Sequence, residues 1–225
     1  MLKFESVSKK FRNGKSAVSD IDLRIDNGEF IFLVGSSGAG KTTLLRLIFR
    51  DLLPTNGSLF LNDIHINKLP ESKIPHLRRK LGFIFQDFKI LYERTVYENV
   101  AIALEILGKK RQEINKKVSE VLETVGLEDK EDYFPIQMSL GELQRVAIAR
   151  AIVGDTEILL ADEPTGNLDP KISWGILKIL NNIHKSGKTI IMATHNVDIV
   201  NTMKKRVITL DKGKIVKDEK GGKYT

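Results

Sequence analysis

The stretch Gly35-Ser-Ser-Gly-Ala-Gly-Lys41-Thr42 decides the fold of this chain. It follows an apolar run over residues 29–34 that is typical of a buried strand, and helix-forming sequence begins at Lys41. Between a strand and a helix, such glycines let successive backbone N–H groups point at phosphate oxygens, and the helix N-terminus adds a favourable dipole. The pattern therefore predicts a loop that binds the phosphates of a nucleoside triphosphate.

The residues of this loop have distinct expected roles. We expect Lys41 to neutralise the β- and γ-phosphates, Thr42 to offer its hydroxyl to Mg²⁺, and Thr43 to contact the α-phosphate. A glycine-rich turn without a ligand is the alternative, and the strand before the loop and the helix after it argue against that alternative. The predicted nucleotide-binding residues of the loop are Gly35, Ser36, Ser37, Gly38, Ala39, Gly40, Lys41, Thr42 and Thr43.

Two adjacent carboxylates end another apolar run. Residues 158–161 read as a buried strand, and Asp162 and Glu163 follow directly. A carboxylate at this place is expected on the Mg²⁺ side of a phosphate site, which assigns Asp162 to the metal. Adjacent side chains of an extended segment point in opposite directions, so Glu163 is expected to face an attacking water. An Asp-Glu pair after an apolar run is common at ordinary strand ends. Together with the predicted phosphate loop, however, the pair indicates a metal and phosphate site.

Two further polar residues follow predicted strands. His195 comes after the strand 189–193, where ligands of open α/β sheets gather, and is predicted to sense the γ-phosphate. Gln86 follows the short strand 81–85 and is a candidate to reach Mg²⁺ or water. The other histidines, which we interpret as ordinary surface or core residues, are His65, His76 and His184.

The composition is that of an ordinary globular chain. Its 225 residues suit one sizeable domain or two small ones, and the absence of cysteine excludes a disulfide framework and a cysteine metal site. No secretory leader is apparent and the apolar runs are shorter than a membrane span, so we expect a soluble chain that reaches a membrane through a partner. The lysines behind the net charge of +7 are spread out, which favours a solvated basic surface over a nucleic-acid site.

The hydrophobic pattern is that of an α/β chain interrupted by a helical section. We expect one domain over 1–225, in which 1–86 and 155–225 form a β-subdomain and the phosphate-loop core, and 87–154 form an α-helical subdomain. The expected strands are 2–7, 21–26, 29–34, 57–63, 81–85, 157–161, 189–193, 206–210 and 214–217. The expected helices are 41–50, 96–107, 112–125, 171–183, 197–203 and one that starts near Gly141.

The segment Met138-Ser-Leu-Gly-Glu-Leu-Gln-Arg-Val-Ala-Ile-Ala-Arg150 resembles the signature helix LSGGQ-QRVAIARA of the ATP-binding cassette (ABC) family. Gln86 and His195 are similar to the Q-loop glutamine and the switch histidine of that family, and Phe11 to the aromatic residue that stacks on adenine. Five motifs in order cover essentially the whole chain. The signature residues are Ser139, Leu140, Gly141 and Glu142, and the residues similar to the D-loop are Asn167, Leu168 and Asp169.

The resemblance implies an α/β fold, the P-loop NTPase nucleotide-binding domain of ABC proteins. This fold has a RecA-like core, an N-terminal antiparallel β-subdomain and an α-helical subdomain. It also implies an ATPase with the cofactors ATP and Mg²⁺, which works as an ATP-dependent head-to-tail homodimer. Each ATP would lie on the phosphate loop of one copy and under Ser139 and Gly141 of the other. Glu163 would act on the attacking water, and His195 would contact the γ-phosphate.

The signature departs from the family pattern at one position, because Leu140 stands where the pattern has glycine. Glycine allows close approach of the backbone to phosphate, whereas leucine adds bulk at that face. We therefore expect a working but slower ATPase. Met138 in place of leucine is a mild change, and glutamate in place of glutamine, as at Glu142, is frequent in the family.

Within the family, the segment from Phe85 to Leu104 resembles the pattern QDF(K/R)LL–RTVxENVA of bacterial cell-division ATPases. This resemblance implies an FtsX-like integral membrane partner, a peripheral location on the cytoplasmic face of the membrane, and an indirect link to cell-wall hydrolases. The residues predicted to dock the partner are Phe85, Phe88, Leu91 and Tyr92. Alternatively, these residues only pack the helical section.

Three other functions are compatible with parts of the sequence. An ATPase of a lipoprotein-releasing or macrolide-export transporter would share nearly all the motifs, and the Asp87-Phe-Lys-Ile-Leu91 stretch favours cell division over it. An ABC protein acting on nucleic acid or ribosomes would have two cassettes or a long coiled coil, which this chain lacks. A nucleotide sensor with little hydrolysis fits Leu140, whereas Glu163 and His195 argue against it.

Overall fold

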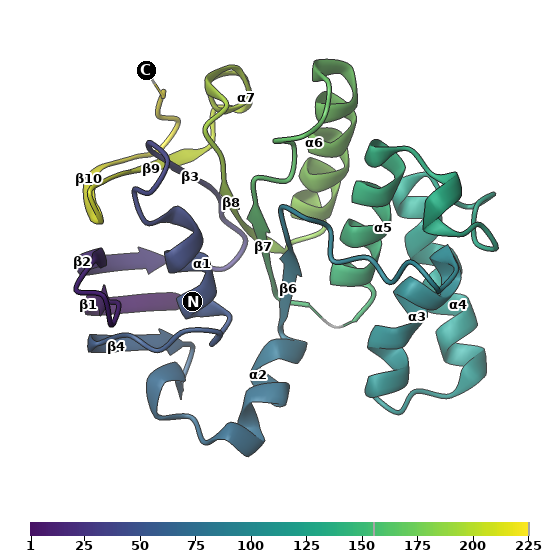
Figure 1. The fold of residues 1–225 in the computed structure, drawn as a ribbon, viewed down its shortest axis with the longest axis horizontal. Helices are drawn as coiled ribbons and strands as arrows, with labels where there is room; N and C mark the ends of the chain where they lie inside the picture. Colours follow the sequence, from purple (N-terminus) through teal and green to yellow (C-terminus); the bar gives the residue numbers. More distant parts are fainter. Residues whose placement is uncertain (155, 225) are drawn as a thin grey trace.

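The computed structural model describes residues 1–154 and 156–224, whose strands form two sheets (Figure 1). The strands are β1 (Leu2–Lys10), β2 (Ser16–Ile25), β3 (Phe30–Val34), β4 (Asn56–Leu61), β5 (Ile64–His65), β6 (Leu81–Ile84), β7 (Ile158–Asp162), β8 (Thr189–Ala193), β9 (Arg206–Asp211) and β10 (Lys214–Glu219). The smaller sheet is antiparallel with the order β2-β1-β4-β5. The larger has the order β10-β9-β3-β8-β7-β6, and its strands are parallel except β10.

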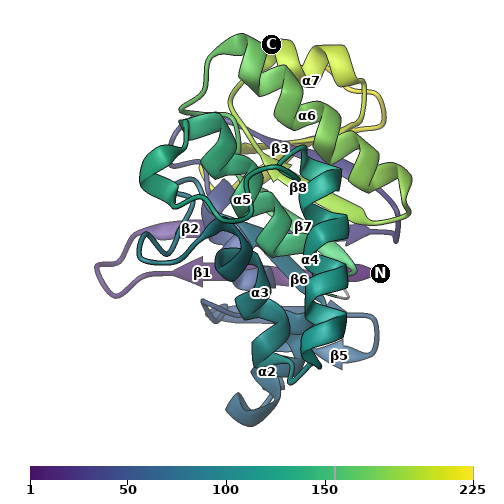
Figure 2. The ribbon, with the colours of Figure 1, turned by 90° about the vertical axis from the view of Figure 1, so that its right-hand side faces the viewer.

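The α-helices are α1 (Lys41–Ile48), α2 (Ile74–Arg79), α3 (Val96–Ile106), α4 (Arg111–Val125), α5 (Leu140–Ile152), α6 (Pro170–Lys185) and α7 (Val197–Met203). Helix α1 lies between the two sheets, and α3, α4 and α5 form a group on the other side of the larger sheet (Figures 1 and 2). Short 3₁₀ helices cover Ile66–Lys68, Glu71–Lys73 and Pro135–Gln137. Among the helices of residues 1–154 and 156–224, none combines the length and the hydrophobicity that a membrane span requires.

The central strands of the larger sheet are buried on both faces, as parallel strands covered on both sides should be. In β3, Ile31 and Leu33 point into a core shared with α1 and the smaller sheet. Phe30, Phe32 and Val34 point into a second core that α3, α4, α5 and α6 cover. Because side chains alternate along a strand, one apolar run supplies both cores.

The stretch before α3 shows why part of the Thr95-Val-Tyr-Glu-Asn99 sequence is structural. Thr95 and Glu98 form a reciprocal capping box at the start of the helix. The buried Asn99 side chain donates to the carbonyls of Leu91, Arg94 and Thr95 and accepts from the Leu91 N–H. The motif therefore fixes the path of the loop that enters α3.

The structure differs from the sequence-based expectations mainly at short elements. Helix α2 and strand β5 are absent from those expectations, because six and two residues are too short to show a period. Strand β2 begins at Ser16, five residues before the predicted start. Asp20, which adopts the left-handed backbone conformation, interrupts the alternation of buried and exposed side chains along β2. The sequence of the first half of the strand therefore lacks a regular period.

Candidate nucleotide-binding site

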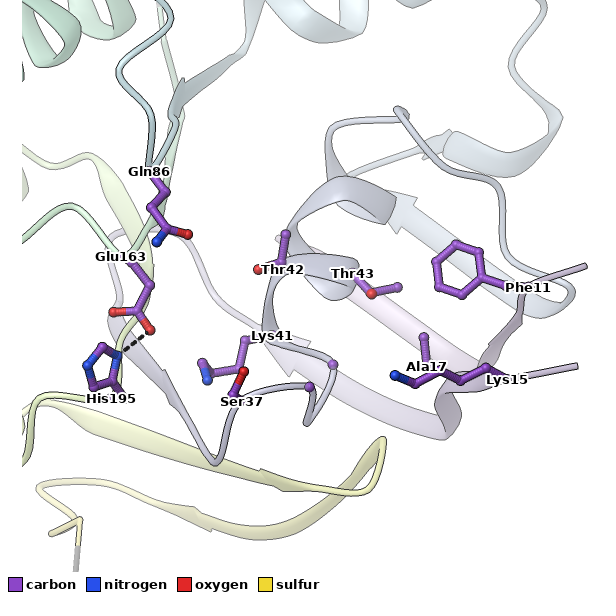
Figure 3. A pocket seen from close by; sticks show the side chains of 12 residues that line it. Phe11, Lys15, Ala17, Ser37, Lys41, Thr42, Thr43, Gln86, Glu163 and His195 are labelled. Carbon is purple, nitrogen blue, oxygen red and sulfur yellow. Dashed lines mark hydrogen bonds and ion pairs between the residues drawn. The ribbon is translucent and has the colours of Figure 1, made fainter. Parts of the chain in front are cut away.

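The carboxyl ends of four parallel strands bring most of the predicted site residues together. The phosphate loop follows β3, Asp162 and Glu163 lie at the end of β7, His195 follows β8 and Gln86 follows β6. A pocket of about 530 Å³ lies at this edge (Figure 3). Its lining consists of Phe11, Lys15, Ala17, Ser37, Gly38, Gly40, Lys41, Thr42, Thr43, Gln86, Glu163 and His195.

The phosphate loop has the backbone that its glycines predict. Gly35 has φ +142° and Gly40 has φ +110°, in the region that favours glycine. A Cβ on Gly35 would lie 2.2 Å from the Leu210 carbonyl oxygen, and one on Gly40 would lie 2.5 Å from that of Ala17. Two of the glycines are thus required by close packing against β9 and β2. Gly35, Ser36 and Ala39 do not line the pocket, and they contribute backbone beneath it.

The Lys41 ammonium group is held at the mouth of the loop. Its side chain is buried, and Nζ donates to the carbonyls of Gly35 at 2.7 Å and Ser36 at 3.2 Å. Both acceptors belong to the loop itself. The positive charge therefore lies inside the cradle of backbone N–H groups, where a phosphate can share it.

Asp162 is buried, with 6% of its surface exposed, and its carboxylate accepts a hydrogen bond from a hydroxyl group. Thr42 Oγ1 donates to Asp162 Oδ1 at 3.0 Å. Burial raises the pKa of Asp162 above its ordinary value, and the Thr42 hydrogen bond opposes this shift. A buried carboxylate and a neighbouring hydroxyl offer hard oxygen ligands, which Mg²⁺ prefers. These two residues therefore fit a Mg²⁺ ion.

Glu163 does not continue the strand, so the expected geometry of adjacent extended residues is wrong. Its φ is +48°, in the left-handed region, and its N–H donates to the carbonyl of Ala193 in the neighbouring strand β8. This turn aims the carboxylate into the pocket, where Oε1 lies 2.9 Å from His195 Nδ1 (Figure 3). A non-glycine residue in this conformation carries strain, which is typical of functional sites.

Phe11 and the Glu163–His195 pair lie at opposite ends of the pocket (Figure 3). Phe11 belongs to the hairpin between β1 and β2, which is closed by a 2.9 Å hydrogen bond from its N–H to the Lys15 carbonyl. Lys15 and Ala17 also line this end, and they are not predicted from the sequence because they belong to no motif. The pocket thus has an aromatic end at Phe11 and an opposite end at the phosphate loop, beside Asp162 and Glu163.

The signature residues Ser139, Gly141 and Glu142 and the D-loop residue Asp169 line a second hollow of about 500 Å³. It is lined by Ser139, Gly141, Glu142, Arg145, Asp169, Lys171, Ile172 and Gly175. Ser139 and Asp169 are the N-caps of α5 and α6, so two helix N-termini meet there. Leu140 is 53% exposed, Asn167 is exposed and Leu168 packs against the helical core.

The buried Gly141 shows that the second glycine of the signature also has a packing role. A Cβ at this position would lie 2.6 Å from Ile172 Cγ2 of α6. Helices α5 and α6 therefore approach each other at a point where only hydrogen fits. Glycine at 141 is required by this helix contact in addition to any phosphate contact.

Of the four residues predicted to dock a partner, only Phe85 lines a groove among the described pockets. This groove has a volume of about 630 Å³. Phe88 packs against the helical core, and Leu91 and Tyr92 are exposed outside the groove. Sequence reasoning missed most of the groove because its lining comes from distant segments: Phe49, Pro75, Arg78, Arg79, Leu81, Gly82, Phe83, Lys89, Ala103, Ile106, Leu107, Arg150, Ala151, Gly154 and Thr156.

Comparison with known proteins agrees with this geometry. The family model "ABC transporter" matches residues 18–166. The cell division ATP-binding protein FtsE of Bacillus subtilis (strain 168) is 49% identical over 224 residues, covering 100% of this chain and 98% of the relative. The protein of the same name from Mycobacterium tuberculosis is 48% identical over 225 residues, with the same coverage.

Solved structures show the same fold. A dimeric structure of a post-hydrolysis state of the ATP-binding cassette MJ0796, bound to ADP and Pi, has a TM-score of 0.88 and 34% identity, with both chains covered in full. The expected class, an ABC ATPase fold with an antiparallel subdomain and a mixed sheet with helices, is confirmed. With the phosphate-loop residues lining a pocket at the strand ends and a family match over more than half of its length, this chain belongs to the ABC transporter family of ATP-binding cassette ATPases.

Proposed function

We propose that this chain is the ATP-hydrolysing subunit of a cell-division complex of the FtsEX type. In this role it couples ATP-driven dimerisation to an FtsX-like integral membrane protein, which controls cell-wall hydrolases. The observation that carries the proposal is the identity of 48% and 49%, over the whole chain, to proteins named for cell division and ATP binding. The location that follows is the cytoplasmic face of the membrane, reached through the partner.

The proposed chemistry uses the pocket from end to end. The adenine lies against Phe11, and the backbone of the phosphate loop and the Lys41 ammonium hold the phosphates. Thr42, Asp162 and Gln86 would hold Mg²⁺, which when bound neutralises charge on the phosphates. Glu163 polarises the attacking water as a general base, and its hydrogen bond with His195 orients both side chains toward the γ-phosphate.

The separate position of the signature supports a head-to-tail dimer. Ser139, Leu140, Gly141 and Glu142 do not line the pocket that holds this chain's own phosphate loop. A second copy can supply them to that pocket, with its D-loop residues Asn167, Leu168 and Asp169 nearby. Closure only with ATP would then follow from contacts that exist in the dimer alone. The solved MJ0796 cassette is also dimeric.

The groove beside Phe85 is the proposed docking site for the membrane partner. Its floor is aromatic, with Phe83 and Phe85 stacked at 4.3 Å between ring centroids. Arg78, Arg79, Lys89 and Arg150 are among the lining residues, and the groove has no acidic lining residue among those described. An amphipathic helix with an apolar face and acidic flanks fits this surface. We further propose that 87–154 acts as an α-helical subdomain of the single domain 1–225, beside the core formed by 1–86 and 155–225.

Affinity capture tests the cell-division proposal. The Glu163→Gln variant, expected to trap ATP, is captured from native membranes and the co-purifying membrane protein is identified. A small polytopic protein with one modest external domain supports the proposal. A permease with an elongated external domain, or one that releases lipoproteins, would contradict it and assign the chain to export.

A surface variant tests the groove in the same experiment. Ile106 is 73% exposed at the groove, so Ile106→Glu should release the membrane protein without unfolding the chain. Val216→Glu is the matched control, because Val216 is 60% exposed on β10, outside the groove. Equal capture by both variants would contradict docking at the groove.

A further inference from the structure

Lys130, in the connection between α4 and α5, reaches the start of the signature helix. Its Nζ lies 3.2 Å from Glu142 Oε1. The other carboxylate oxygen, Oε2, accepts hydrogen bonds from the Ser139 N–H at 2.8 Å and from the Ser139 hydroxyl at 2.7 Å. The Glu142 carboxylate is therefore a bridge that joins Lys130 to Ser139.

Lys130 and Glu142 are both charged at neutral pH. Hydrogen bonds from Ser139 hold the pKa of Glu142 below its ordinary value, and Lys130 adds to the effect. The hydrogen bond to Glu142 raises the pKa of Lys130. The two side chains are 26% and 27% exposed, so water screens the pair less than it would on an open surface. The Lys130 ammonium also lies 4.7 Å from the centre of the Tyr133 ring, which confines it.

The position of this carboxylate creates an electrostatic problem for the dimer described above. In the head-to-tail arrangement, the γ-phosphate of the second copy's ATP approaches Ser139 and the N-terminus of α5. Glu142 stands in the first turn of that helix, and an unpaired carboxylate there would repel the phosphate. Three other charged residues, Arg145, Asp169 and Lys171, line the same hollow. Arg145 donates to the Val125 carbonyl at 2.6 Å and Asp169 caps α6, whereas Lys130 is the cation paired with the Glu142 carboxylate.

We propose that Lys130 is a positioning residue for ATP hydrolysis, which neutralises Glu142 and holds it on Ser139 so that the start of α5 accepts the γ-phosphate bound by a second copy. The inference rests on the proposed head-to-tail dimer and adds a residue outside the signature to it. Lys130 lies in the segment before the signature and belongs to none of the motifs found in the sequence. Its contribution is electrostatic, because the bridge leaves the pair with no net formal charge.

The competing explanation is that the Lys130–Glu142 pair acts only as a mechanical tether. The effect of Glu142→Gln on dimerisation distinguishes neutralisation from tethering. If Lys130 acts by neutralisation, Glu142→Gln removes the repulsive charge and makes Lys130 unnecessary. If the pair only ties the connection to α5, Glu142→Gln breaks the tie and harms dimerisation as much as Lys130→Met does.

ATP-driven dimerisation in the Glu163→Gln background gives the measurement, as a dimer dissociation constant from analytical ultracentrifugation with Mg²⁺-ATP. We expect Lys130→Met to weaken the dimer at least tenfold and Lys130→Arg to stay within threefold of the parent. Glu142→Gln alone should dimerise no more weakly than the parent, and combined with Lys130→Met it should restore the dimer. The Lys130→Met defect should shrink as ionic strength rises from about 0.01 M to about 0.15 M, which shortens the Debye length from about 30 to about 8 Å.

The matched control is Lys116→Met, which removes a lysine from a surface pair with Glu120 on α4. It should leave the dimer unchanged. Melting temperature and nucleotide binding by the monomer check that each variant is folded. Parental dimerisation by Lys130→Met, or equal weakening by Glu142→Gln, overturns the inference. Failure of the Glu163→Gln parent to dimerise with ATP overturns the head-to-tail dimer and, with it, this role of Lys130.

Discussion

Nδ1 of His195 and Oε1 of Glu163 lie 2.9 Å apart, although 32 positions separate the two residues in the chain. The strands that precede them, β8 and β7, are neighbours in the larger sheet. The Glu163 N–H also donates to the Ala193 carbonyl at 3.0 Å, so the backbone fixes the distance between the two strand ends. The pair is therefore preorganised by the sheet.

Replacing Glu163 with glutamine should lower ATP turnover by about 10²- to 10⁴-fold, the usual contribution of a general base. The change keeps the shape of the side chain, so Mg²⁺-ATP binding should remain near that of the native chain. Phosphate release and fluorescent-nucleotide titration measure the two properties. His195→Ala should also lower turnover, whereas His76→Ala, on the exposed surface of α2, should not. Unchanged turnover in Glu163→Gln would contradict its role.

Asp162→Asn should stabilise the nucleotide-free protein at neutral pH and abolish Mg²⁺-dependent turnover. Burial raises the pKa of Asp162, which means that folding disfavours its charged form. The resulting loss of folding stability is fully present at pH values above the pKa of Asp162 in the folded state. It disappears as the pH falls below the ordinary pKa of aspartate. The gain in melting temperature should therefore be largest near pH 7 and vanish in acid. A gain that stays constant across pH would show that burial of the charge is not its cause.

Gly141→Ala should destabilise the chain by about 1–3 kcal/mol, because its methyl group meets Ile172 in a packed contact. For a domain of this size, each kcal/mol corresponds to a shift of about 2–4 °C in melting temperature. Thermal denaturation of the single variants and of Gly141→Ala with Ile172→Ala measures the coupling. The double variant should be more stable than the sum of the single effects predicts. Strict additivity would mean that the two positions do not meet.

Leu140→Gly should tighten the ATP-driven dimer or raise turnover, by several-fold, because it removes exposed bulk at the start of α5. The same change costs up to about 1 kcal/mol of helix stability, so the melting temperature should fall slightly. Phosphate release and sedimentation in the presence of ATP measure the effects. If both dimerisation and turnover are unchanged or reduced, Leu140 is not the obstacle that its bulk predicts.

Residues close in sequence were the easiest to predict. The phosphate loop and the strand that ends at Asp162 each carry their chemistry within a few positions, so local pattern was sufficient. The position of Lys15 in the pocket and the groove beside Phe85 depend on segments that only tertiary packing brings together. Glu163 lines the pocket, as the sequence predicts, but it does so because its backbone turns at φ +48°. The alternation of side chains, on which the prediction rests, applies only where the strand continues.

Helix α5 joins two distant parts of the molecule as one rigid body. Its first residues carry the signature, while near its other end Arg150 donates to the carbonyls of Phe88 at 2.8 Å and Lys89 at 2.7 Å, directly after Gln86. Thirteen residues span about 20 Å. A hydrogen-bonded helix of this length does not shorten along its axis, so a displacement of Phe88 or Lys89 along that axis would be carried to the signature residues at the other end. In the function proposed above, this rigid connection lets a partner helix in the groove and events at the phosphate loop act on the same signature residues.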